Sequence, residues 1–296
     1  MREDMVFVKG GKYKLYENNN IEVETFDLEV SKYLVTQKLW TDIMGRNPSI
    51  VKDILGMKPV ENITWWHALQ FCNKLSELEG LRPVYDLSQI KKGKLYINQL
   101  NNEKSIDYYE DFLIDKNGKI GDFSKTEGYR LPTSIEWEWF AGGGQKAINE
   151  GTFGHIFYKR DYLDKIAWYC DNSFFTTHDP GEKMANELGI FDYIGNVYEW
   201  CHDQRCEFKK FKEEKGNTFY NMYKVIMGGS FCSDPYDFYP FTISYPSIKG
   251  LTSSLCFSCG TFKARSKLSI TGSNVLMSSP LITPATCKRS AEERFL

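Results

Sequence analysis

The chain has 296 residues, of which 42% are hydrophobic and 15% aromatic, and its formal net charge is −2. This is enough apolar material for the core of one large domain or two small ones. The near-neutral charge excludes the concentrated Lys and Arg footprint of a nucleic-acid-binding protein, and no apolar run reaches the ~18 residues of a transmembrane segment.

The first part of the chain predicts short strands followed by two capped helices. Residues 5–35 combine β-branched and aromatic residues with Gly-Gly and Asn turns, which is typical of short strands. Thr36 is a predicted N-cap of a short helix that ends at Gly45. A longer helix is predicted after Thr64, because apolar side chains recur there at helical spacing, and Gly80 closes it.

The middle and end of the chain are less regular. Residues 88–128 are polar and predict an excursion with a hairpin, whereas Thr133-x-x-Glu136 is a capping box that begins a third helix before three glycines. After about residue 150 the pattern favours short strands and turns. Residues 267–296 are rich in Ser and Thr and are interpreted as a C-terminal extension. Short helices mixed with irregular strands predict the α+β class.

Six motifs together resemble the formylglycine-generating enzyme family, also called the sulfatase-modifying factors. The resemblance spans roughly residues 5–266 and implies a C-type-lectin-like fold with little regular secondary structure, which we expect for a domain of residues 1–266. The motifs, in family order, are MVFVKGGKYKL, VSKYLVTQKLW, PVENITWWHALQFCNKLS, YRLPTSIEWEWFAGGG, NELGIFDYIGNVYEWCHD and VIMGGSF.

The family's oxidase members carry two cysteines shortly after Gly-Gly-Ser, and these thiolates bind copper, a soft ion that suits sulfur ligands. Here Cys232 follows the Gly-Gly-Ser almost at once, and no further cysteine occurs until Cys256. We therefore expect no catalytic residues. A copper oxidase acting on a protein cysteine, with Cys232 and a distant cysteine at its centre, is the alternative.

The same resemblance raises the question of two other metals, iron and calcium. An iron-dependent branch of the family uses several histidines, but the four histidines here form no pair at ligand spacing, so each is interpreted as an ordinary polar residue. The family also holds a structural calcium around its GNVxEW turn. Transferred to this sequence, its ligands would be the side chains of Asp192 and Glu199 and the main-chain carbonyls of Gly195 and Val197, an oxygen-only set that suits a hard cation.

The segment 231–258 has an unusual composition. Adenine-directed mutation of AAC codons leaves codons that end in C, which never encode Lys, Glu, Gln, Met or Trp. Those five types make up 71 of the 296 residues, so about seven are expected in a window of this length, but the segment holds only Lys249. The same bias marks the variable proteins of diversity-generating retroelements, the treponemal ones among them, which this chain also resembles. That resemblance implies a rewritten, solvent-facing binding surface.

We therefore predict a non-enzymatic ligand-binding display protein whose variable region, about 231–258, binds an unknown protein or surface ligand. Aromatic side chains supply rigid contact area, and Ser and Asp supply hydrogen bonds and charge, as in antibody loops. About half of the aromatics are expected in the core, Phe231 and Phe257 among them. The predicted ligand-binding residues are Ser233, Asp234, Tyr236, Asp237, Phe238, Tyr239, Phe241 and Tyr245.

The first residues, MREDMVFVKGG, contain no apolar signal-peptide region. Either the protein stays inside the cell or an export signal is missing from this sequence. A display role predicts the cell surface, with the cytoplasm as the alternative.

Overall fold

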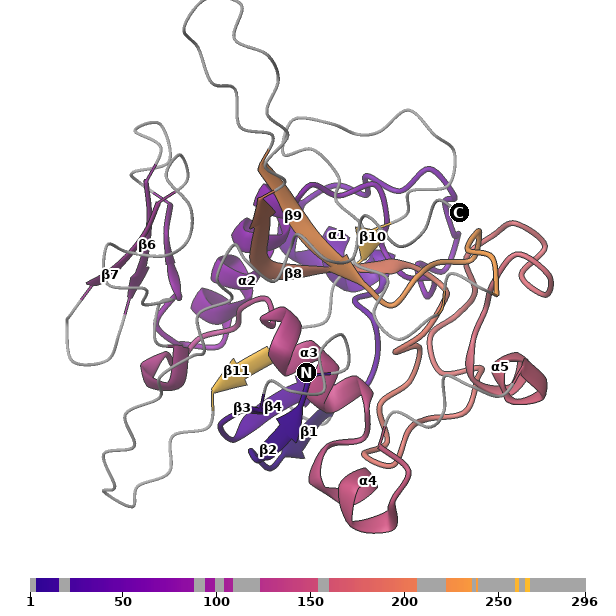
Figure 1. The fold of residues 1–296 in the computed structure, drawn as a ribbon. Coiled ribbons are helices and arrows are strands. Elements are labelled where there is room, and N and C mark those ends of the chain that lie inside the picture. The colour runs from indigo at the N-terminus through magenta and orange to yellow at the C-terminus, as the bar shows by residue number, and fades with distance from the viewer. Residues whose placement is uncertain are drawn as a thin grey trace, which may run out of the picture.

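The structure is a computed structural model of the whole chain (Figure 1). It describes residues 4–15, 22–87, 94–98, 104–108, 123–153, 160–206, 222–235, 238, 259–260 and 264–266. Short helices surround small sheets, and much of the described chain lies in turns, so the predicted α+β class is confirmed. The boundary at residue 266 stays a prediction, and the extension 267–296 lies outside the described residues.

One sheet joins the two ends of the described chain. Strand β4 (Leu28–Ser31) pairs antiparallel with both β1 (Met5–Val8) and β11 (Ala264–Ser266). Beside it, β2 (Lys12–Lys14) and β3 (Glu22–Glu24) form an antiparallel pair in which each strand buries only its central residue. This period of two confirms the strands predicted within residues 5–35.

Both predicted N-terminal helices are present with their predicted caps. Helix α1 (Gln37–Met44) begins after Thr36, whose hydroxyl accepts a hydrogen bond from the Leu39 amide, and its C-cap is a left-handed glycine. Helix α2 (Trp65–Leu78) begins after Thr64, which accepts from the amide three residues later. A hydroxyl at the N-cap satisfies an amide that the first helical turn leaves without a partner.

The polar excursion contains the predicted hairpin. Strand β6 (Lys94–Asn98) pairs antiparallel with β5 (Tyr85–Asp86) on one side and with β7 (Lys104–Tyr108) on the other. A single turn of 3-10 helix, η3 (Phe123–Lys125), leads the chain back to the core.

Three helices follow, and the sequence predicted only the first. Helix α3 (Ser134–Ala141) has the predicted capping box, and its C-cap is the first of the three glycines. Helix α4 (Gly144–Glu150) starts at the third glycine, and α5 (Arg160–Ile166) stands apart at one side of the molecule (Figure 1). The prediction of only strands and turns after residue 150 was wrong for α5.

The last sheet carries the segment that precedes the predicted variable region. Strand β8 (Tyr198–Cys206) pairs antiparallel with β9 (Met222–Met227), with an irregular register between Trp200 and Gln204. Strand β10 (Cys259–Gly260) adds to β8 in the parallel sense. The chain therefore leaves this sheet after β9 and returns to it at β10.

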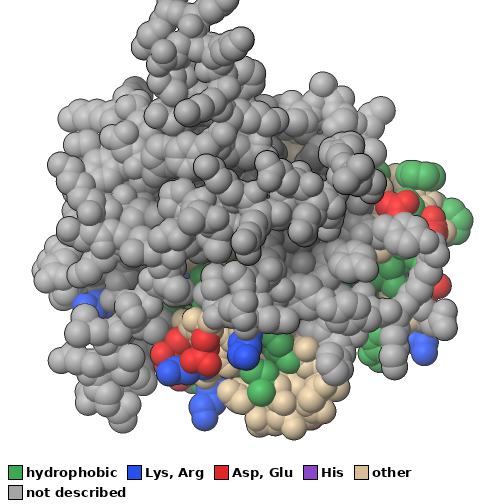
Figure 2. All heavy atoms as spheres, viewed as in Figure 1, with side chains coloured by type: hydrophobic (Ala, Val, Ile, Leu, Met, Phe, Trp, Pro, Cys, Tyr) green, Lys and Arg blue, Asp and Glu red, His purple; other side chains and the backbone are tan. Residues whose placement is uncertain are grey.

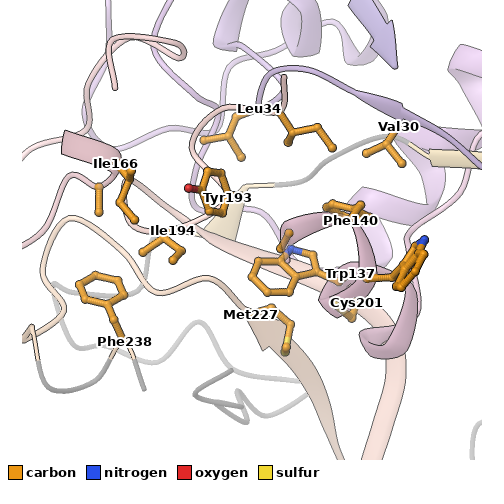
Figure 3. Packing of buried hydrophobic residues seen from close by; sticks show 14 of the residues in the cluster. Val30, Leu34, Trp137, Phe140, Ile166, Tyr193, Ile194, Cys201, Met227 and Phe238 are labelled. Atoms are coloured by element: carbon orange, nitrogen blue, oxygen red, sulfur yellow. The ribbon is translucent and has the colours of Figure 1, made fainter. Parts of the chain in front are cut away.

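Two buried clusters form the core. The first packs α3 and the N-terminal strands against the loops before β8, with Trp137, Phe140 and Tyr193 at its centre (Figure 3). The second packs α1 and α2 against the last sheet. Arg130 and Glu136 form a buried ion pair with N–O distances of 2.7 and 2.8 Å, which anchors α3.

Candidate functional site

The candidate site is built around the turn that precedes β8. Gly195 has a φ of +77°, and a Cβ on it would lie 2.3 Å from the Trp168 carbonyl oxygen, so only glycine fits this close approach. Its amide donates to the Gly228 carbonyl oxygen at 2.8 Å. The turn thus fixes two loops that are distant in sequence: the one after α5 and the one after β9.

Asn196 is the polar centre of this turn. Its side-chain carbonyl accepts from the His178 amide, and its side-chain amide donates to the His178 carbonyl and to Asp192 Oδ1. Asn196 was not among the residues predicted to form the site. Its position directly after the glycine of the turn was the available signal, because Asn tolerates the left-handed backbone it adopts here, with a φ of +59°.

Two buried carboxyl groups flank the turn. Burial raises the pKa of Asp192 to about 6, although Gly181 N and Asn196 donate hydrogen bonds to it. Burial also raises the pKa of Glu199 well above its usual value, and the charge of Asp192 adds to the effect. Trp137 Nε1 donates to Glu199 Oε2 at 2.9 Å, whereas Glu199 Oε1 is buried without a hydrogen-bond partner.

These groups were the predicted calcium ligands. Glu199 has an unpartnered Oε1, which lies 3.3 Å from the point that a Cβ of Gly228 would occupy, with the Tyr193 carbonyl oxygen at 3.5 Å. Trp137 Cζ2 lies 3.3 Å from the same point, so an aromatic carbon shares this space with the two oxygens. Both oxygens of Asp192 already accept hydrogen bonds within the loop. Where the chain is described, no group of three His, Cys, Asp or Glu could hold a metal ion. Any cation here would therefore depend on main-chain oxygens as well as Glu199.

The predicted variable region begins with a turn held by hydrogen bonds from three directions. The Phe231 amide donates to the Asn196 carbonyl oxygen, and the Phe231 carbonyl oxygen accepts from the Ser173 hydroxyl at 2.8 Å. The Cys170 amide donates to the Ser233 carbonyl oxygen at 3.1 Å. The start of the predicted variable segment is thus firmly positioned, and the burial of Phe231 confirms its assignment to the core.

The structure distributes the predicted ligand-binding residues unevenly. Asp234 is exposed. Ser233 and Phe238 are buried, so in this structure they support the surface and are not available to a ligand. Ser233 Oγ accepts from the Ser230 amide, and Phe238 packs edge-on against Tyr169. The other predicted residues, Tyr236, Asp237, Tyr239, Phe241 and Tyr245, lie outside the described residues, as does Phe257.

Burial of Phe238 follows from the glycines before it. Gly229 has a φ of +75°, and a Cβ there would lie 2.4 Å from the Phe238 ring, so the ring packs against bare backbone. Figure 3 shows Phe238 beside Ile194 at the edge of the first core cluster. Sequence periodicity could not reveal this, because the contact depends on a missing side chain nine residues earlier.

The cysteines occupy two kinds of environment. Cys72 and Cys201 are buried, and burial raises the pKa of the Cys72 thiol to about 12, which makes it an inert packing residue. Cys170 and Cys232 are half-buried and lie in segments joined by the Cys170–Ser233 main-chain hydrogen bond. The sequence analysis did not pair these two positions.

The candidate site is therefore built from turns and loops rather than from helices and strands. The molecule is an α+β protein in which small sheets hold long loops in place. A family model described as "Sulfatase-modifying factor enzyme 1-like domain" matches residues 1–245. The chain belongs to this family, which confirms the resemblance to the formylglycine-generating enzymes.

Relatives and structures of several kinds are similar to the chain. "Chaperone protein LppX" of Paenibacillus barcinonensis is 33% identical over 252 residues, which are 78% of this chain and 79% of the relative. The formylglycine-generating enzyme of Mycobacterium tuberculosis is 31% identical over 84 residues, covering 26% of this chain and 28% of the enzyme.

Among solved structures, Treponema denticola variable protein 1 superposes with a TM-score of 0.60 at 27% identity, covering 89% of this chain and 95% of that protein. CarF has the same TM-score at 20% identity, covering 89% of this chain and 98% of CarF, and supports the fold alone. The predicted likeness to a treponemal variable protein is confirmed.

Proposed function

We propose that the protein is a non-catalytic ligand-binding protein whose residues 231–258 form a diversified surface on a C-type-lectin-like scaffold. The observation that carries this is the likeness to Treponema denticola variable protein 1 over 89% of the chain. The shortage of Lys, Glu, Gln, Met and Trp in the same segment supports it. A relative named as a chaperone is consistent with a role in binding rather than catalysis.

The anchoring of the segment suits this role. The segment starts in the turn at residues 230–233, which is held by main-chain hydrogen bonds to Asn196 and Cys170 and by serine hydroxyls, and after the segment the chain returns at β10 by main-chain pairing. Such bonds tolerate changes of side chain between the two anchors. Asp234 is exposed at the start of this interval and would contribute charge to a contact.

The test is to sequence the DNA that encodes residues 228–266 together with its downstream flank. We expect a near-copy of this DNA close by, with adenine in the copy at the positions that differ, and a reverse transcriptase gene beside it. If there is no copy and related isolates keep the segment unchanged, diversification is refuted.

A display role implies a location outside the cell. No helix in the part of the chain that the structure describes is long and apolar enough to cross a membrane. We propose the cell surface, reached by an export signal. Digestion of intact cells with an added protease should remove the protein, and protection until lysis would place it in the cytoplasm.

A copper oxidase of the family's type is the second candidate, and the main-chain hydrogen bond between the segments of two half-buried cysteines favours it. Cys170 and Cys232 lie in hydrogen-bonded segments, and thiolates suit Cu(I). This candidate predicts stoichiometric Cu(I) binding that Cys232→Ala and Cys170→Ala each abolish, with Cys72→Ala as the control. Binding with those properties would replace the non-catalytic proposal.

We also propose a structural calcium ion at the turn before β8. The buried, unpartnered Glu199 Oε1 and the nearby Tyr193 carbonyl oxygen support it. Calcium should raise the melting temperature of the wild type at pH 7.5 but not that of Glu199→Gln, because the variant lacks the charged ligand. Equal shifts in both proteins would place the ion elsewhere.

A further inference from the structure

Two consecutive phenylalanines face solvent beside the start of the predicted variable segment. Phe174 is 87% exposed and Phe175 is 71% exposed, the backbone of both is left-handed, with φ of +55° and +54°, and we call the pair the phenylalanine ledge. This conformation is unfavourable for residues with a Cβ. Such outliers persist where the surroundings hold them, and they concentrate at functional sites.

The loop that bears the ledge is firmly held. Buried Ser173 accepts a hydrogen bond from the Phe175 amide at 3.1 Å and donates one to the Phe231 carbonyl oxygen at 2.8 Å. His178 Nε2 lies 2.8 Å from the Ser173 carbonyl oxygen, and the His178 amide donates to Asn196. The exposure of the two rings is therefore built into the fold, and the same serine fixes both the ledge and the variable segment.

A second loop with exposed apolar side chains contacts the segment that follows the ledge. Lys58 Nζ donates to Thr176 Oγ1 at 3.5 Å, so the loop before Lys58 lies next to the residues after the ledge. That loop exposes Ile54 fully, Leu55 by 75% and Met57 by 47%. Contiguous exposed apolar side chains on a soluble protein mark interaction sites.

Acidic side chains outnumber basic ones in the loops beside the ledge. The second loop carries Lys52 and Lys58, and Lys58 is offset by the neighbouring Asp53. The ledge's own loop exposes three carboxylates, and the turn before the variable segment exposes a fourth: Asp171, Asp179, Glu182 and Asp234. The ammonium of the nearby Lys183 is engaged by its own surroundings, because its Nζ donates to the Asp164 carbonyl oxygen and lies 3.8 Å from the Trp168 ring centre. In Figure 2, hydrophobic and acidic side chains lie side by side at the edge of the molecule where α5 lies in Figure 1.

This charge pattern selects the partner. An acidic border repels an anionic membrane surface and attracts a protein surface that carries Lys and Arg around an apolar centre. We propose that the phenylalanine ledge is a constant part of the ligand-binding surface, and that the ligand is a protein with an apolar patch bordered by basic residues. The inference rests on the proposed binding function and adds a contact that diversification leaves unchanged.

The test uses the full chain and two sets of fluorescent synthetic peptides. Both sets share an apolar centre of Phe, Leu and Met, and their flanks are either Lys and Arg or Asp and Glu. The test variant is Phe174→Gly with Phe175→Gly, which should fold because glycine favours a positive φ. The control is Leu78→Ser, which removes a side chain that is 66% exposed at the end of α2.

We expect the basic peptides to bind the wild type at least tenfold more tightly than the acidic ones. The double glycine variant should bind the basic peptides at least tenfold more weakly than the wild type, whereas Leu78→Ser should bind them with unchanged affinity. Equal binding of both sets, or unchanged binding by the glycine variant, overturns the proposal. So does ledge-dependent dimerisation in sedimentation without peptide binding, or ledge-dependent binding to phosphatidylcholine vesicles.

The two proposals fail separately. The DNA test can refute diversification while the basic peptides still bind through the ledge. A variant with residues 239–247 replaced by Gly and Ser retains the buried Phe238 and should keep ledge binding. If diversification is present but the glycine variant binds the peptides as the wild type does, only the ledge proposal is refuted.

Discussion

The raised pKa of Asp192 predicts how stability depends on pH. Because the carboxyl pKa rises from 3.8 to about 6 on folding, the folded state binds the proton more tightly than the unfolded state. Its contribution is fully present below pH 3.8 and is lost as the pH rises through about 6. At about 1.4 kcal/mol per unit, the free energy of unfolding should fall by about 3 kcal/mol across this window because of this group.

The variant Asp192→Asn removes that contribution, because an amide side chain resembles the protonated acid and does not titrate. It also removes the smaller effect of the Asp192 charge on Glu199. Urea unfolding of both proteins between pH 4 and pH 7.5, with a chelator present to exclude calcium, gives the difference in unfolding free energy. Since part of the contribution is already lost at pH 4, the unfolding free energy of the variant should rise by about 2.4 kcal/mol relative to that of the wild type between pH 4 and pH 7.5. The exposed Asp179→Asn is the matched control and should show a much smaller change. If the difference between the wild type and Asp192→Asn is independent of pH, the reasoning is refuted.

Three further substitutions test the scaffold by urea unfolding. Glu136→Gln leaves the buried Arg130 charge without its partner and should lower the free energy of unfolding by about 3–5 kcal/mol. A decrease below about 1 kcal/mol would show that water reaches the pair. Gly229→Ala places a Cβ against the Phe238 ring at a positive φ and should lower the free energy of unfolding by about 1–3 kcal/mol. An unchanged urea midpoint would mean that the Phe238 ring can move away from the new side chain. Thr133→Ala removes the N-cap of α3 and should lower the free energy of unfolding by about 1 kcal/mol, whereas Thr133→Ser keeps the hydroxyl and should be as stable as the wild type. Equal losses of stability in both variants would exclude a capping role.

Local signals predicted local structure. The threonines at positions 36, 64 and 133 each cap a helix as expected, because an N-cap depends only on the next three residues. The six motifs together predicted the family, since their order reflects the whole fold. Helix α5 was missed because it is only seven residues long, and the two buried positions among residues 162–166, Leu163 and Ile166, are too few to establish a helical period.

The candidate site was predicted less completely because tertiary contacts decide it. Phe231 could be assigned to the core from its place beside the glycines, but the burial of Phe238 depends on its packing against Gly229. The exposure of Phe174 runs against its hydrophobicity and follows from a backbone that Ser173 holds. No periodicity in the sequence encodes these contacts.

The pairing of β4 has a consequence for synthesis of the protein. Leu28 pairs with Val8 near the start of the chain and with Ser266 near the end of the described part, so one strand has partners made early and late. While the ribosome is still producing the middle of the chain, one edge of β4 has no partner, and unpaired edges promote aggregation. Contacts of such long sequence separation also slow folding. The protein should therefore complete its fold only after translation has passed Ser266, and a chaperone that covers the open edge until then would increase its yield.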